Sequence, residues 1–546
     1  MAETSPKSPL LDALMEIFEP HDKTARSRAH SHVEALLEAQ QQGDTALQVS
    51  PQDASWLRSR PWVGDGARPT PTVLNGLLLQ FHIYWQAEQQ VLSTLKPRIR
   101  SDDPPAPLPE DFVQAAEQQQ LDPEKLIQIQ RALSQKVTFL SGGPGTGKTT
   151  TLTWLLAALL RQQPDLAIAL AAPTGKAAQR MKEAMDRAIP ALPLADEQKA
   201  RLLAIAPSTL HRLLGISRRP QPRYHADNPL PAELIVVDEA SMVDVLLLAK
   251  LVLALNENTR LILMGDPNQL TSVEAGNVLA DLTKRFAQAH CHLKRSHRFN
   301  QTIGRLADTI LEGDGDAAWQ QLQAKNQDAL GQMALKPSVI LEAAKPGLED
   351  YLQRMRAFTS TDYHSTAIQA REIMAALAHF RVLTPLRHHP QWGVTALNQH
   401  LIRHFARQGL RPLHAKEFYA GQPILIQEND YQLGLFNGDS GLILPFDGQV
   451  VVWFEEGEQM RAVPLSQLPA WETAYAMTVH KAQGAEFDEV VLVLPNEQTP
   501  VLTRELVYTA LTRAKQRFTL AGSKEALIDA VRAATLRTTG LSGAVH

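Results

Sequence analysis

The stretch Gly142-Gly-Pro-Gly-Thr-Gly-Lys148-Thr149 decides the fold of this chain. Glycines of this kind let backbone N–H groups curl around phosphate oxygens at the start of a helix, while the lysine reaches the β- and γ-phosphates and the threonine binds magnesium. An apolar run at 137–140 precedes the motif and a helical pattern at 150–161 follows it, as the motif requires. A chance glycine-rich turn is the alternative, and this context argues against it. The sequence therefore predicts a site for ATP and Mg²⁺ made by Gly142, Gly143, Pro144, Gly145, Thr146, Gly147, Lys148, Thr149 and Thr150.

Outward from this motif, short apolar runs alternate with helical stretches in both halves of the chain. Strands that alternate with helices form parallel sheets, which bind ligands at the carboxyl ends of their strands. We therefore predict an α/β fold with one parallel sheet in each half. The runs lie at 137–140, 166–172, 234–237, 260–264, 381–383, 490–494 and 518–521.

Two carboxylates follow directly after one of these runs. Asp238 and Glu239 come after the apolar run at 234–237, at the tip of an expected strand. Asp238 could then complete the magnesium shell, and Glu239 could orient and deprotonate the attacking water. Acidic pairs are also common on protein surfaces. Beside a phosphate-binding loop the catalytic interpretation is favoured.

Three further side chains are candidates for acting on the phosphates. Gln269 follows the run at 260–264, where its amide could sense the γ-phosphate, and an ordinary loop amide is the alternative. Phosphoryl transfer also needs cations on the developing charge, and these can come from another domain. Arg298 and Arg513 are the candidates, although an arginine on a helix face is usually only solvated.

The bulk composition is that of a large globular protein. Its 546 residues suffice for three or four domains, and 44% of them are hydrophobic. The net charge of −4 excludes the overall positive field of a passive DNA-coating protein, so any nucleic-acid track must be local. The only cysteine, Cys291, allows no intrachain disulfide and is expected in the core. Without a signal segment or a membrane-spanning apolar run, the expected location is the cytoplasm.

A proline-rich stretch separates the N-terminal part from the rest. Four prolines between 101 and 110 cannot lie inside a helix or a central strand, so we expect a small helical N-terminal domain at 1–98 and a linker at 99–112. Aromatic side chains are frequent in this domain, as they are at interface cores. We expect the domain to dock a partner, while the alternative is that these side chains fill its own core.

Two α/β units should follow the linker. We place them at 113–345 and 346–546, with the phosphate-binding loop in the first. Between about 399 and 473 the second unit is interrupted by β-leaning sequence that carries the hairpin signal Asn437-Gly438. A small β-barrel-like insertion is predicted there.

Taken in order, these motifs resemble those of superfamily 1 helicases, and in detail those of RecD-type enzymes. The order matters more than any single match, and the resemblance covers about residues 113–523. The segments that carry it are 142–149, Asp238-Glu239, Gly265-Asp-Pro-Asn-Gln269, Arg298-Phe299, Thr478-Val-His-Lys-Ala-Gln483-Gly484 and Val507-Tyr-Thr-Ala-Leu-Thr-Arg513, with the RecD-like Ala172-Pro-Thr-Gly-Lys176, Thr209-Leu-His-Arg-Leu-Leu-Gly215 and Asn437-Gly438-Asp439.

The resemblance implies an ATP-dependent 5′–3′ DNA helicase with two RecA-like motor domains that close on ATP. Arg298 and Arg513 would then be arginine fingers across the cleft. A short pin-like hairpin is implied near 216–230, and an SH3-like form for the β insertion. The residues that would face single-stranded DNA are Thr174, Lys176, Thr478 and His480.

Residue chemistry agrees with these DNA contacts, because hydroxyls and a lysine at strand ends can grip phosphates without reading bases. His480 alone would more often be a core histidine. The sequence departs from the family pattern ahead of the phosphate-binding loop. Where helicases of this group usually carry an adenine-reading glutamine, this chain has Lys125, with Gln128 and Gln130 close by.

The N-terminal part shows a second, shorter resemblance. Pro69-Thr-Pro-Thr-Val-Leu-Asn-Gly-Leu and Tyr84-Trp-Gln-Ala-Glu88 are similar to the N-terminal domain of exodeoxyribonuclease V alpha subunits. This implies a heterotrimer with beta and gamma subunits that acts on DNA ends in double-strand break repair and recombination. The alternatives are a stand-alone RecD-like helicase and a nucleotide-gated scaffold that never translocates. A scaffold would not need Lys148, Glu239 and Arg513 intact.

Overall fold

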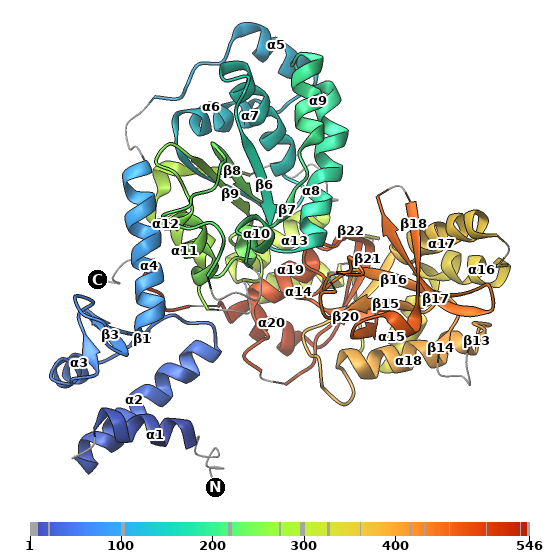
Figure 1. Cartoon of the computed structure of the whole chain (residues 1–546). Helices are drawn as coiled ribbons and strands as arrows, with labels where there is room; N and C mark the ends of the chain where they lie inside the picture. Colours follow the sequence, from blue (N-terminus) through green and yellow to red (C-terminus); the bar gives the residue numbers. More distant parts are fainter. Residues whose placement is uncertain are drawn as a thin grey trace.

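The computed structural model describes residues 9–19, 22–99, 104–216, 221–271, 275–294, 301–324, 328–360, 362–413, 418–430, 432–457, 459–497, 499–535 and 537–542. Figure 1 shows two α/β units side by side, with the N-terminal segment extending from the first. In the following, the first unit is residues 104–294, the second unit is 301–535, and the N-terminal unit is 9–99.

The first unit is built on a six-stranded sheet in which every neighbouring pair is parallel, in the order β10-β5-β9-β8-β6-β7. Strands β5, β8 and β9 are buried along almost their whole length because helices cover both faces. The predicted first sheet is therefore confirmed. The strands are β5 (Val137–Gly142), β6 (Ile168–Ala172), β7 (Ser208–Thr209), β8 (Leu234–Val237), β9 (Arg260–Gly265) and β10 (His290–Leu293).

Side chains of alternate strand residues enter two different cores. Leu234 and Val236 of β8 pack with one group of helices, while Ile235 and Val237 pack with the other. The helices on the first face are α5 (Glu110–Gln118), α6 (Pro123–Ser134), α7 (Lys148–Gln162), α8 (Gly175–Ala188) and α9 (Asp196–Ala204), and those on the second are α10 (Leu210–Leu213), α11 (Val245–Leu253) and α12 (Val278–Arg285), with short 3₁₀ turns η2 (Ile189–Ala191), η3 (Ala240–Met242) and η4 (Ala287–Ala289).

The second unit repeats the arrangement with a five-stranded parallel sheet in the order β11-β22-β21-β12-β20. This confirms the second predicted sheet. Its strands are β11 (Leu330–Met333), β12 (Phe380–Thr384), β20 (Ala476–Thr478), β21 (Phe487–Val493) and β22 (Ala514–Ala521), and its helices are α13 (Gln301–Glu312), α14 (Gly315–Gln323), α15 (Pro337–Gly347), α16 (Glu349–Ala357), α17 (Tyr363–Leu377), α18 (Val394–Ala406), α19 (Arg504–Leu511) and α20 (Lys524–Arg532).

The junction between the units lies earlier than the residue 345 expected from the sequence. Strand β11 pairs with β22 in the second sheet, and α13 and α14 pack against α19 and α20. We therefore place the junction near residue 300. The sequence did not indicate this, because Leu330-Gly-Gln-Met333 is too short and too polar to be recognised as a strand by itself.

The β insertion in the second unit is a five-stranded antiparallel sheet in the order β18-β17-β16-β15-β19. The Asn437-Gly438 turn joins β15 to β16, with Gly438 at φ +97°, which favours glycine. The insertion ends at Thr473 as expected, but residue 399 lies inside α18, so its β part begins later. The elements are β13 (Pro412–Leu413), β14 (Phe418–Tyr419), β15 (Pro423–Ile426), β16 (Ser440–Phe446), β17 (Gln449–Glu456), β18 (Gln459–Pro464), η5 (Leu465–Gln467) and β19 (Trp471–Thr473).

The N-terminal unit is not only helical, as was expected from the sequence, because it contains a four-stranded sheet in the order β1-β4-β3-β2. Two of these strands meet at Asn75-Gly76, a hairpin signal that was present in the sequence. Several of its aromatic side chains, including Trp62, fill its own core. The elements are α1 (Pro9–Phe18), α2 (Lys23–Gln41), β1 (Leu47–Gln48), α3 (Pro51–Leu57), β2 (Val63–Gly64), β3 (Thr72–Asn75), β4 (Leu78–Phe81), α4 (His82–Leu95) and η1 (Lys96–Arg98).

Helix α4 belongs to the first unit as much as to the N-terminal unit. It packs along α11, and Tyr84, Ala87, Val91 and Leu95 are part of that unit's core. Figure 1 shows α4 standing beside α11 and α12. Removing the chain before the expected linker at 99–112 would remove α4 and would therefore expose the apolar face of α11.

The C-terminal segment, residues 537–542, ties the three units together. After α20 it returns to the N-terminal unit, where Thr538 O accepts from the backbone N–H groups of Thr45 and Ala46. Leu541 is buried in the core of the first unit.

Two smaller expectations concern the core and the surface. Cys291 on β10 is buried, and burial raises the pKa of its thiol to about 12, which fits an unreactive core residue. Across the ranges that the structure describes, no helix has both the length and the apolar character needed to cross a membrane.

Candidate nucleotide and motor site

The phosphate-binding loop joins β5, the second strand of the first sheet, to α7. Gly145 and Gly147 have φ values of +76° and +83°, which side chains other than glycine adopt only with strain. Lys148 folds back over the loop, and its Nζ donates to Gly142 O at 2.7 Å and to Gly143 O at 3.2 Å. The lysine therefore lies where phosphate oxygens could replace these two carbonyls.

Asp238 and Glu239 lie at the carboxyl end of β8, on the same edge of the sheet. Asp238 Oδ1 accepts from Glu239 N at 2.8 Å. Burial, and then the charge of Glu239, raise the pKa of Asp238 to about 6, while Lys148 opposes the rise. Glu239 has a left-handed backbone with φ +50°, a strained geometry of the kind that clusters at functional sites.

These carboxylates fit the expected magnesium ion. A buried carboxylate with a raised pKa is stabilised by a cation placed beside it. Thr149, at the first turn of α7, and Asp238 are the residues that could hold the ion between the loop and the sheet.

The loop after β9 holds Gln269 and forms a direct contact between the two units. Gln269 Nε2 donates to Asp266 Oδ2 at 3.2 Å, while its buried Oε1 has no partner among the described residues. Tyr508 of the second unit donates its hydroxyl to the same Asp266 Oδ2 at 3.0 Å. A Cβ on Gly143 would lie 3.0 Å from this hydroxyl, so Tyr508 also contacts the phosphate-binding loop.

Two more hydrogen bonds complete this contact. Leu270 N donates to Thr509 Oγ1 at 2.9 Å, and Gln483 Nε2 donates to Leu270 O at 2.6 Å. Sequence reasoning did not single out Tyr508, Thr509 or Asp266. They lie inside quoted motifs, but no local pattern indicates that they meet.

The two candidate arginine fingers have different outcomes. Arg298 lies outside the described residues. Arg513 is 3% exposed and its guanidinium is held within the second unit, where it donates to Thr509 O, Ala485 O and Thr512 Oγ1 at 3.2–3.4 Å. To reach a phosphate, Arg513 would have to release these acceptors.

Arg180 on α8 is a further cation between the units that sequence reasoning missed. Burial lowers the pKa of its guanidinium, and the nearby charges that act on it include Glu486, Arg513 and Glu239. Arg180 is thus close both to the carboxylate pair of the first unit and to Arg513 of the second.

The four expected DNA contacts form two separate pairs in the part of the chain that the structure describes. Thr174 caps α8, accepting from Ala177 N at 3.2 Å, and Lys176 follows it, with a pKa lowered to about 8 by burial and by Arg180 and Arg381. Thr478 ends β20 and accepts from Lys481 N at 3.2 Å. His480 is half-buried, and burial lowers its pKa.

The β insertion lies against the first of these pairs. A Cβ on Gly175 would lie 3.6 Å from the Phe436 side chain, and Asp439 is one of the charges that act on Lys176. Asn437-Gly438-Asp439 is therefore the tip of the insertion that approaches α8.

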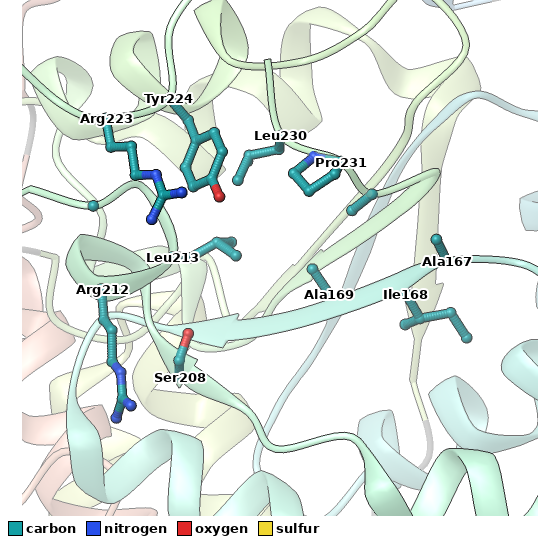
Figure 2. A pocket seen from close by; sticks show the side chains of 12 residues that line it. Ala167, Ile168, Ala169, Ser208, Arg212, Leu213, Arg223, Tyr224, Leu230 and Pro231 are labelled. Atoms are coloured by element: carbon teal, nitrogen blue, oxygen red, sulfur yellow. The ribbon is translucent and has the colours of Figure 1, made fainter. Parts of the chain in front are cut away.

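A cavity of about 430 Å³ lies elsewhere, at the β6–β7 edge of the first sheet. Figure 2 shows Arg223, Tyr224 and Leu213 around it, and Ala167 and Ile168 line it at the amino end of β6. Because the phosphate-binding loop follows the carboxyl end of a parallel strand, this cavity is not the nucleotide site. It adjoins the expected pin at 216–230, of which 217–220 lie outside the described residues.

Comparison with known proteins agrees with this geometry. Residues 125–275 match the family model described as "AAA domain", and 473–521 match the "UvrD-like helicase C-terminal domain". The first parallel sheet carries the phosphate-binding loop, and helix α19 of the second unit reaches a loop of that first sheet. Together with the two family matches, this arrangement defines a superfamily 1 helicase, which is an ATP-dependent motor.

Whole-chain relatives identify the family more closely. The chain is 37% identical to "RecBCD enzyme subunit RecD" of Mycolicibacterium smegmatis, over 97% of this chain and 98% of the relative. It is 33% identical to the protein of the same name from Haemophilus influenzae, over 85% of this chain and 79% of that one. It is also 32% identical to "ATP-dependent RecD2 DNA helicase" of Deinococcus radiodurans, over 77% of this chain but 52% of the relative. The chain belongs to the RecD family.

Proposed function

We propose that this helicase is the alpha subunit of an exodeoxyribonuclease V, acting in the cytoplasm on DNA ends during double-strand break repair and recombination. The observation that carries the proposal is the end-to-end match to a RecBCD subunit RecD, against a match to about half of a RecD2 helicase. The beta and gamma subunits would be its partners, and the nuclease would reside on one of them.

In this proposal the first unit binds the nucleotide. The loop from Gly142 to Thr150 surrounds the phosphates, and Lys148 exchanges its two loop carbonyls for phosphate oxygens. Thr149 and Asp238 would hold Mg²⁺, which supplies positive charge to the β- and γ-phosphate oxygens. Glu239 orients and deprotonates the attacking water.

The second unit would respond to the nucleotide through the loop after β9. Gln269 would sense the γ-phosphate by turning its Nε2 donor from Asp266 to a phosphate oxygen, which would change the hydrogen bonds to Tyr508 and Thr509. Arg513 would release the acceptors that hold it within the second unit and would stabilise the negative charge that develops on the transferring phosphate. Arg298 would be the second arginine finger.

DNA would be gripped by groups that do not read bases. Thr174 and Lys176 on α8, with Thr478 and His480 after β20, would hold the phosphates of one strand as the units open and close. Movement 5′ to 3′ is the polarity that the family resemblance implies.

The test is strand displacement by the chain alone and with its two proposed partners co-expressed. We expect co-purification as a heterotrimer and unwinding of duplexes that carry a 5′ single-stranded tail, with a matched 3′-tailed duplex as control. Unwinding of only the 3′-tailed substrate would contradict the polarity. Failure to form the heterotrimer would favour a stand-alone helicase, and assembly without unwinding or ATP hydrolysis would favour a scaffold.

The docking role of the N-terminal unit is tested by comparing the full chain with a deletion variant that keeps α4. Removal of residues 1–79 should leave ATP hydrolysis on single-stranded DNA in place but prevent assembly, because α4 still covers α11. Normal assembly of this deletion variant would refute the docking role.

A further inference from the structure

Lys125 on α6 points its ammonium group at the phosphate-binding loop. A Cβ placed on Gly147 would lie 2.6 Å from Lys125 Nζ and 3.2 Å from its Cε. The side chain is 8% exposed. Among the described residues its Nζ has no hydrogen-bond or ion-pair partner, and the carboxylates of Asp122 and Glu124 act on it only through space.

The ammonium nitrogen keeps some contact with water, but a charged group that is partly withdrawn from water without a partner is still unfavourable. Burial accordingly lowers the pKa of Lys125. An anion at the start of α7 would reverse this effect. A phosphate chain binds at the backbone N–H groups that begin α7, so the expected anionic ligand would lie beside the unpaired ammonium group of Lys125.

A second polar group on the same helix also lacks a partner. Gln128 lies one turn after Lys125 on the same face of α6, and its side-chain oxygen is buried without a hydrogen bond among the described residues. Unpaired buried carbonyl oxygens are rare in folded proteins and mark places where a ligand can complete the bonding. Of the two groups, only Lys125 can pair with an anion, because the Gln128 side-chain oxygen can only accept hydrogen bonds.

We propose that Lys125 is a second nucleotide-binding cation, which donates to the phosphate chain beside Gly147 and holds the nucleotide by charge rather than by its base. An ammonium group only donates hydrogen bonds, whereas recognition of the adenine amino group requires an acceptor. Lys125 therefore strengthens binding of ATP, ADP and GTP alike. This inference rests on the proposed role of the loop as the nucleotide site.

The test compares Lys125→Met with Lys136→Met in the full chain. Both changes remove one lysine charge and keep similar volume, but Lys136 lies at the opposite end of β5, where its Nζ donates to Asn258 Oδ1. We measure the affinities for ADP, ATP and GTP by titration calorimetry. Lys125→Met should weaken all three by about 10-fold or more, as expected for a lost charge-assisted hydrogen bond, while Lys136→Met should leave them unchanged.

Two outcomes would overturn the inference. Unchanged affinities in Lys125→Met would show that the ammonium does not touch the nucleotide, and a loss for ATP and ADP that spares GTP would show that Lys125 reads the base. If Lys125→Met does not fold, Lys125→Ala is measured in the same way with the same expectation. A wild-type chain that bound no nucleotide would instead contradict the proposed function itself.

Discussion

The two parallel sheets share one architecture but carry different groups at their carboxyl ends. In the first sheet, the loops after β5, β8 and β9 hold the phosphate-binding glycines, the pair Asp238-Glu239 and Gln269. In the second, the described residues after β12 include no glycine-rich loop, and Thr384 instead donates to Trp392 O. Its contribution comes from α19 and the residues just after it, including Tyr508 and Arg513. The difference teaches that a few loops at the carboxyl ends of the strands decide the role of a parallel sheet. The same sheet architecture can carry a nucleotide-binding loop or supply groups that contact one.

The largest effect should come from removing the phosphate-binding cation of the first sheet. Lys148→Gln should reduce DNA-stimulated ATP hydrolysis to background, a loss of about 1,000-fold, because a cation on the transferring phosphate is lost. The thermal unfolding temperature should stay the same, since no core packing changes. Turnover above about a tenth of wild type, a loss below about 1.4 kcal/mol, would contradict the binding role of the first sheet.

A comparable but smaller effect should come from either side of the cleft. Glu239→Gln in the first unit and Arg513→Ala in the second should each slow hydrolysis by about 100-fold. Nucleotide affinity should remain nearly the same, because both groups act late in the reaction. Single-turnover hydrolysis and equilibrium binding separate these effects. If Arg513→Ala weakened ATP binding but spared turnover of bound ATP, the second unit would help to bind the nucleotide rather than to stabilise the transition state.

A moderate effect is expected at the contact between the sheets. Tyr508→Phe deletes only the hydrogen bond to Asp266. The ratio of DNA-stimulated to basal ATPase rates should fall by about 3- to 10-fold, on the scale of one ordinary hydrogen bond. Tyr363→Phe is the matched control, because it removes a hydroxyl that donates to Met460 O away from the cleft. Equal ratios in the two variants would show that this contact carries no signal.

The smallest effect concerns the C-terminal segment, which leaves the second unit and binds the first. Thr539 Oγ1 donates to Asp281 Oδ2 at 2.6 Å, and Gly540 N donates to Glu88 Oε1 at 3.0 Å. Burial raises the pKa of Asp281 to about 6, and burial also raises the pKa of Glu88. Both carboxyls therefore favour the folded state over the unfolded chain when protonated, and for Asp281 this stabilisation is present below about pH 4 and lost as pH rises through about 6.

The free energy of unfolding of the whole chain measures this contribution. It should be larger at pH 5 than at pH 7, by about 1 kcal/mol. Asp281→Asn should remove most of the difference, because asparagine can still accept from Thr539, and a double variant with Glu88→Gln should abolish it. An unchanged pH dependence in the double variant would rule out these two groups as the cause.

Much of the fold was predictable because its signals are local. The apolar runs predicted four strands of the first sheet and three strands of the second, and the hairpin signal at Asn437-Gly438 indicated the β insertion. The equivalent signal at Asn75-Gly76 was present but not used, so the N-terminal sheet was missed. The early junction near residue 300 had no local signal, because β11 is recognisable as a strand only through its pairing with β22.

The sequence by itself determined the chemical groups of the site, since the glycine loop, the acidic pair and the later motif residues are defined by order and spacing along the chain. Only the tertiary structure decided which of them meet. Tyr508 reaches Asp266 across 242 positions of sequence, Lys125 reaches Gly147, and residues 537–542 reach the N-terminal unit. The physical reason is that a contact between distant residues depends on how whole sheets pack, and a hydrogen bond of that kind leaves no periodicity in either segment.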